Sequence, residues 1–219
     1  MKITSSIYLV GGSSESHPAD AAVYLVKTGE GAVLIDAGTG GGTRRIAKNI
    51  QSAGSDIAAV THLFVTHCHY DHTGGVNDVR RLCGCAVIAH TPDADYLEAG
   101  EQEVTAALWY GSAIEPTPVD IKVSEPERAF DIGGTVFTMH HTPGHSPGSA
   151  VITVRSDGML VLFGQDVHGP LNAVLRSNRA DYVKSLEFMM SLNADILCEG
   201  HFGVIKGKDS VHEFIESYL

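Results

Sequence analysis

The chain has 219 residues, 43% of them hydrophobic and 19% charged, a composition typical of a globular protein with a sizeable core. Its formal net charge of −11 argues against a nucleic-acid partner, because proteins that grip phosphate backbones carry basic patches. No apolar run approaches the roughly 20 residues of a membrane helix. The N-terminus turns polar after a few apolar residues, so we also expect no cleaved signal and a cytoplasmic location.

Short apolar runs alternate with helical stretches in the first half of the chain. Ile46 and Ile50 lie four residues apart and Gly54 follows, which predicts a helix over 43–54. Residues 91–119 contain the only tryptophan, Trp109. We interpret this stretch as a lid, a pocket wall or a subunit contact, or alternatively as a helix packed on the core. The remaining predicted elements are strands at 2–10, 21–28, 32–38, 61–67 and 86–90 and a helix at 73–84.

The second half repeats this style. The sequence SDG (156–158) predicts a hairpin turn, and Val183, Leu186 and Met190 predict the buried face of a helix. Strands are predicted at 135–141, 149–156, 159–166 and 194–201, and helices at 179–192 and 208–219. This order indicates two sheets with helices packed outside each. No linker divides the chain, so we predict one domain over residues 1–219.

The stretch THCHYDH (66–72) follows an apolar strand directly. In extended backbone, residues two apart point the same way, so His67 and His69 can reach one point. Asp71 and His72 follow as the chain turns into a helix, and they diverge from the first pair. The spacing therefore favours two metals, with His67 and His69 at one and Asp71 and His72 at the other.

A zinc-like ion needs about four ligands, so others must come from elsewhere in the chain. His145 lies in the Pro-Gly loop HTPGHSPGS (141–149), Asp166 ends the strand LVLFGQD, and His201 ends ILCEGH. Each position alone is weak evidence, but together they supply polar side chains at strand ends or turns. Cys68 lies between two ligands, and the same alternation points its side chain away as a small buried filler.

These motifs, in this order over nearly the whole chain, resemble the metallo-β-lactamase superfamily, whose first motif LIDAG (34–38) also fits. The resemblance implies an α/β protein with an αββα sandwich of two mixed β-sheets flanked by helices. It implies a first metal bound by His67, His69 and His145 and a second by Asp71, His72 and His201. Asp166 would bridge both ions, and Asp36 would orient the ligands. The expected cofactors are two divalent metal ions, zinc first, with iron or manganese as alternatives.

The chemistry expected of such a site is hydrolysis of an ester-like bond (thioester, lactone, ester or amide) in a small-molecule substrate. A metal-bridging hydroxide would be the nucleophile, and Asp71 would be the catalytic residue that orients it and shuttles a proton. One alternative is a mononuclear iron persulfide dioxygenase using His67, His145 and Asp166. Another is a non-catalytic metal-binding protein of the same fold. A homodimer is expected on general grounds alone.

Overall fold

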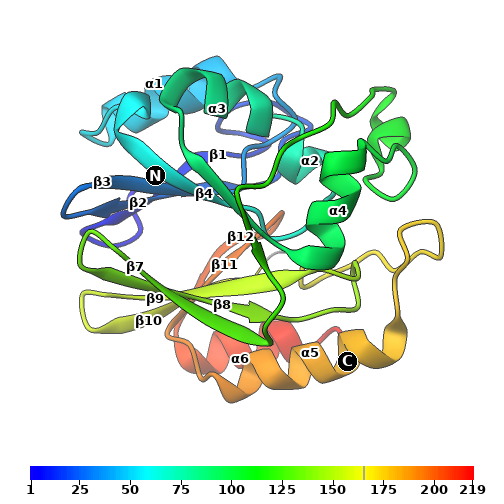
Figure 1. Cartoon of the computed structure of the whole chain (residues 1–219). Coiled ribbons are helices and arrows are strands. Elements are labelled where there is room, and N and C mark those ends of the chain that lie inside the picture. Colours follow the sequence, from blue (N-terminus) through cyan, green and yellow to red (C-terminus); the bar gives the residue numbers. More distant parts are fainter. Residues whose placement is uncertain (165) are drawn as a thin grey trace.

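Two six-stranded sheets stack face to face with helices on both outer sides (Figure 1). The computed structural model describes residues 1–164 and 166–219. A core layer between the sheets brings together Phe64 from one sheet and Phe137 from the other, whose stacked rings lie 5.5 Å apart. This is the predicted αββα arrangement of two mixed sheets.

The first sheet has its strands in sequence order. Its first three strands pair antiparallel, and its last three join the third in parallel pairing. Parallel strands require crossover connections, and α1, α3 and α4 provide apolar faces that cover this sheet. The strands are β1 (Ile7–Gly11), β2 (Val23–Thr28), β3 (Gly31–Ile35), β4 (Val60–Phe64), β5 (Ala86–His90) and β6 (Ile121–Val123).

The second sheet also follows the chain, with its last strand at one edge. All its neighbours pair antiparallel except β10 and β11, which are parallel and flank the helix α5 in sequence. The strands are β7 (Glu127–Ile132), β8 (Thr135–His141), β9 (Ala150–Ser156), β10 (Met159–Phe163), β11 (Ile196–Glu199) and β12 (Gly203–Lys206).

The helices form the two outer layers and part of one edge (Figure 1). None of the helices formed by the described residues has both the length and the apolar character to cross a membrane. They are α1 (Thr43–Ser52), α2 (Tyr70–Thr73), α3 (Val76–Cys83), α4 (Thr91–Ala99), α5 (Arg179–Ser191) and α6 (Lys208–Glu216), with 3₁₀ turns η1 (Ile57–Ala59) and η2 (Ala107–Tyr110).

The structure corrects the sequence-based elements at several places. The strand predicted at 2–10 begins at Ile7, because Ile3 donates its N–H back to the Ile7 carbonyl in a turn. The edge strands β6, β7 and β12 were not predicted, since their faces are only partly buried and show weak apolar patterning. Residues 91–119 contain a helix packed on the core, α4, followed by a loop with η2.

The buried face of α5 is also shifted by one residue from the prediction. Tyr182 and Met189 are buried, while the predicted Val183 and Met190 are only half-buried. Leu186 belongs to both sets and is fully buried. The apolar residues on this helix surround most of its circumference, so its sequence did not distinguish between the two faces.

Candidate metal centre

The predicted site residues lie just beyond strand ends that meet at one edge of the sandwich. β4 ends at Phe64 and β10 at Phe163, earlier than predicted, so His67, His69 and Asp166 lie in loops. His145 lies in the loop between β8 and β9, and His201 follows β11. The strands thus end before the functional side chains begin, which leaves those side chains free to converge.

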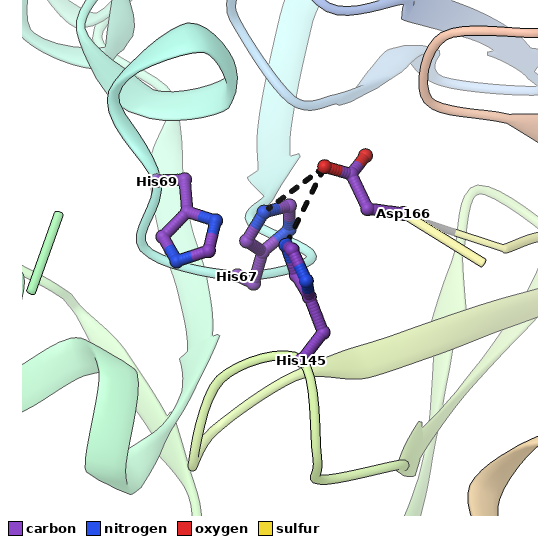
Figure 2. A group of neighbouring side chains, drawn as sticks. All are labelled: His67, His69, His145 and Asp166. Atoms are coloured by element: carbon purple, nitrogen blue, oxygen red, sulfur yellow. Dashed lines mark ion pairs between the residues drawn. The ribbon is translucent and has the colours of Figure 1, made fainter. Parts of the chain in front are cut away.

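The first group consists of His67, His69, His145 and Asp166, all of them buried. One ligand atom from each lies within 4.8 Å of the others. Asp166 Oδ2 is 3.9 Å from His67 Nε2 and 3.4 Å from His145 Nε2. Figure 2 shows both of these rings directed at the Asp166 carboxylate, with the His69 ring on the far side in this view.

The second group consists of Asp71, His72, Asp166 and His201. One ligand atom from each of these residues also lies within 4.8 Å of the others. Asp166 Oδ1 is 3.1 Å from His72 Nε2 and 3.4 Å from His201 Nε2. Asp71 Oδ2 is 3.1 Å from His201 Nε2. The Asp166 carboxylate is therefore shared, with one oxygen turned to each group. All seven predicted side chains are brought together, in the two sets that the sequence resemblance implied.

The outer ring nitrogens of three histidines are held by hydrogen bonds. His72 Nδ1 lies 2.7 Å from Asp36 Oδ2, and His145 Nδ1 lies 3.0 Å from the Pro170 carbonyl. The Thr66 hydroxyl donates to Asp36, so its oxygen is left to accept from His67 Nδ1 at 3.1 Å. When the ring is neutral, such partners fix the tautomer that leaves Nε2 without a proton, as in metal-binding histidines. Asp36 has the orienting position that was expected of it.

The ring nitrogens and the carboxylate oxygen that face the middle of the two groups lack hydrogen-bond partners. Their state tests whether these residues suit a metal ion. The Nε2 atoms of His67, His69, His72 and His145 and the Asp166 Oδ1 atom are buried without an aligned hydrogen bond among the described residues. The short contact of His72 Nε2 with Asp166 Oδ1 does not have hydrogen-bond geometry. Buried polar atoms without partners are costly. Imidazole nitrogens and carboxylate oxygens are ligands that zinc and similar divalent ions accept, so the residues fit such ions.

Charge differs between the two groups. Burial lowers the pKa of His67 well below its usual value and that of His69 to about 3, so both are neutral at pH 7. Burial also acts against protonation of His72 and His201, but the carboxylates around them outweigh it. They raise the pKa of His72 well above its usual value and that of His201 to about 10. Without metal, His67 and His69 are neutral and ready to bind, whereas His72 and His201 hold protons.

Asp93 is a buried carboxylate that links two of the ligand loops and that no motif of the sequence had indicated. Its Oδ2 accepts the Cys68 N–H at 2.8 Å and the Ser146 hydroxyl at 2.5 Å, and its Oδ1 accepts the Gly148 N–H at 2.6 Å. A Cβ atom added at Gly148 would lie 2.4 Å from the Asp93 nitrogen, so only glycine permits this approach. Asp93 thus ties the His67–His69 loop to the His145 loop.

We expect Asp93→Ala to weaken metal binding by about 10- to 100-fold, the usual effect of removing a partner that orients ligands. It leaves the Cys68 and Gly148 N–H groups buried without acceptors, which costs about 1–3 kcal/mol each. Equilibrium dialysis against zinc and thermal unfolding measure the two effects. Asp95→Ala is the matched control, because Asp95 is on the same helix but exposed, paired with Lys122. Unchanged zinc affinity in Asp93→Ala would show that the loops hold their geometry without it.

Glu199 was also missed, although it stands in the EGH motif beside His201. It is fully buried at the end of β11, and its carboxylate accepts the backbone N–H groups of His201 and Phe202 at 2.6 and 2.8 Å. It also lies 2.9 Å from His168 Nδ1. The His168 ring lies 5.0 Å from that of His201. Glu199 therefore fixes the turn that presents His201.

The other flanking side chains lie outside both groups. His90 stacks on His141 with ring centroids 3.7 Å apart, and His140 pairs with Glu127. Cys68 is fully buried in the core beneath the first sheet, facing away from His67 and His69 as predicted. Alternation along the chain therefore separates the ligands from the packing residue between them.

Curated relatives of the chain are named as metal-dependent hydrolases and thioesterases. A probable metallo-hydrolase of Methanocaldococcus jannaschii is 30% identical over 129 residues, 59% of this chain and 60% of that protein. A human acyl-coenzyme A thioesterase is 28% identical over 91% of this chain and 78% of its own length. An atrochrysone carboxyl ACP thioesterase of Aspergillus fumigatus is 29% identical over 84% of this chain but only 38% of its own length. At the level of the family, these names confirm the predicted metal-dependent hydrolase.

Solved structures share the architecture. A metallo-β-lactamase mutant from Cronobacter sakazakii superposes with a TM-score of 0.82 at 22% identity, covering 100% of this chain and 92% of that one. A metallo-β-lactamase from Elizabethkingia meningoseptica gives 0.79 at 26% identity, covering 92% of this chain and 76% of that one. The fold predicted from the motifs is confirmed. Since the model of the metallo-β-lactamase superfamily matches residues 18–201, this chain belongs to the metallo-β-lactamase superfamily.

Proposed function

We propose that the chain is a dinuclear metal-dependent hydrolase that cleaves an ester-like bond in a small molecule. One observation carries this proposal: two groups of ligand residues, all buried except His201, share Asp166, and the Nε2 atoms of the four buried histidines lack hydrogen-bond partners among the described residues. In this proposal, His67, His69 and His145 hold the first ion, Asp71, His72 and His201 hold the second, and Asp166 contributes to both. Zinc is the first choice, with manganese or iron as alternatives.

Bound divalent ions lower the pKa of coordinated water to about 7 and polarise a carbonyl oxygen, which supplies a nucleophile at neutral pH. The residues of the chain position this water and manage its proton. Burial raises the pKa of Asp71, but His72 and His201 more than offset that and leave it below its usual value. In the metal-loaded protein those histidines would be neutral and the bound ion would supply the positive charge in their place, so Asp71 would be ionised at pH 7 and would accept a proton from water. It then returns the proton to the departing thiol or alcohol, so one water is consumed and one acid is released.

Among ester-like bonds, a thioester is the first to test, because two relatives that match more than four-fifths of this chain are named thioesterases. The lactone, ester and amide remain alternatives within the same chemistry, since each places a carbonyl next to a leaving group. The choice among them depends on the loops around the site rather than on the ligands.

The alternative of a mononuclear iron persulfide dioxygenase would use His67, His145 and Asp166 alone. These three do lie together, with both Nε2 atoms facing the same Asp166 oxygen. The second group favours the hydrolase, because the dioxygenase would leave Asp71, His72 and His201 without a use.

Elemental analysis of the protein purified without chelator separates these functions. We expect about two zinc or manganese ions per chain, together with thioester or lactone hydrolysis that is lost on chelation and restored by the metal. About one iron per chain with oxygen uptake on a persulfide would replace the hydrolase by the dioxygenase. Bound metal with no turnover in either assay would instead identify a non-catalytic metal-binding protein.

A further inference from the structure

Three segments next to the metal groups contain no Asp, Glu, Lys or Arg, although charged residues make up 19% of the chain. They are residues 104–114, 167–175 and 200–205. Each touches a residue of the metal groups or its immediate neighbour. These three stretches are therefore uncharged in a protein whose net charge is −11.

Residues 104–114 pack against α2, the short helix that carries Asp71 and His72. The Tyr70 N–H donates to the Thr105 carbonyl at 2.7 Å, and the Ser112 hydroxyl donates to the Tyr70 hydroxyl at 2.7 Å. The Tyr70 and Tyr110 rings lie 5.6 Å apart. Next to Tyr110 in the chain, Leu108 and Trp109 are 57% and 52% exposed.

Residues 200–205 and 167–175 approach from the side of His201. Phe202 follows His201 directly and is 59% exposed, with its ring 5.1 Å from that of His168. Residues 167–175 begin after Asp166, hold His145 through the Pro170 carbonyl and expose Val174. In Figure 1, this segment and residues 104–114 both project on the same side of the molecule, beyond α4.

Large apolar side chains at the surface mark binding sites when they gather beside a functional group. Half of the exposed large hydrophobic side chains among the described residues belong to these three segments: Leu108, Trp109, Tyr110, Val174 and Phe202. We call these five side chains the apolar rim. Because each of the three segments contacts a residue of the metal groups or its neighbour, we take the occupant to be attached to the reacting bond rather than to be a separate partner protein.

We infer that the apolar rim binds the hydrocarbon part of an acyl group whose carbonyl lies at the metal centre, so that the substrates are acyl esters or thioesters with an apolar chain. This inference rests on the proposed hydrolase function. The absence of charged side chains from the three segments favours an uncharged, apolar group over a sugar, nucleotide or peptide. Each methylene that the rim buries fully should improve binding by about three- to four-fold.

Trp109 is the only tryptophan, so its fluorescence reports on the rim directly and without turnover. Straight-chain carboxylates of two to ten carbons, the products of the expected reaction, are titrated into the metal-loaded protein. We expect a blue shift of the emission and a Kd that falls by about three-fold per added methylene. The same dependence on chain length should appear in kcat/KM for acyl thioesters built on one common thiol.

Phe202→Ala and Leu108→Ala should weaken the dependence on chain length of both the carboxylate Kd and the thioester kcat/KM. Both variants keep Trp109 as the fluorescent reporter. Val136→Ala is the control. Val136 is 53% exposed near the start of β8, at the other end of the strand from His141, so its replacement should leave both the Kd and the kcat/KM series unchanged. Carboxylates that bind without any dependence on chain length, or leave the emission unchanged, overturn the inference even if thioesters are hydrolysed. A chain-length series in binding without turnover supports the rim and refutes the hydrolase instead.

Discussion

Replacing Asp166 with alanine is expected to leave less than one metal ion per chain and to abolish hydrolysis. Asp166 is the side chain shared by both groups, with Oδ2 facing His67 and His145 and Oδ1 facing His72 and His201. Its removal takes one ligand from each ion and the countercharge from His72. Loss of a partner that merely orients a ligand costs about 10- to 100-fold, so kcat/KM should fall by at least about 100-fold.

Elemental analysis and thioester turnover, measured on the same preparation, check this expectation. Asp209→Ala is the matched control, because Asp209 is an exposed aspartate in the first turn of α6. Circular dichroism establishes that both variants are folded. Normal metal content and full activity in Asp166→Ala would contradict the bridging role of this side chain.

Binding of the second metal ion is expected to depend strongly on pH, and binding of the first only weakly. In the metal-free protein, His67 and His69 have lowered pKa values, so no proton has to leave them near pH 7. The pKa of His201 is raised to about 10 and that of His72 is also raised, so both must lose a proton before they bind metal. Below these pKa values, each released proton makes apparent affinity rise about tenfold per pH unit.

For two protons, the affinity of the second step should therefore rise by up to about 100-fold from pH 7 to pH 8. Competition with a chelator at the two pH values measures it, and calorimetry in buffers of different ionisation enthalpy counts the protons. His201→Ala should remove one proton from the second step. His212→Ala, which changes an exposed histidine on α6, should not. Two steps with the same pH dependence would show that the groups do not differ in charge.

The fold was largely predictable because its elements are local. The buried strands β2, β5 and β8 and the helices α1 and α6 carry clear apolar patterns, and their predicted bounds agree with the structure to within two or three residues. The edge strands β7 and β12 were not predictable in this way, since one face of each meets solvent and its patterning is weak. The strand that supplies Asp166 ends at Phe163, because a functional side chain there needs a loop to turn inward.

The sequence by itself indicated the seven candidate side chains, and its spacing separated His67 and His69 from Asp71 and His72, whereas the family resemblance assigned His145, Asp166 and His201 to the two groups. It could do so because four of them fall within residues 67–72, and the others stand at strand ends, which meet at one edge of such a sandwich. The tertiary structure alone revealed two further carboxylates that hold the ligand loops. Asp93 reaches Cys68 and Gly148 across 25 and 55 residues, and Glu199 reaches His168 across 31. The apolar rim likewise joins loops that are distant in the chain. Such contacts depend on how the loops pack, so no local pattern of residues encodes them.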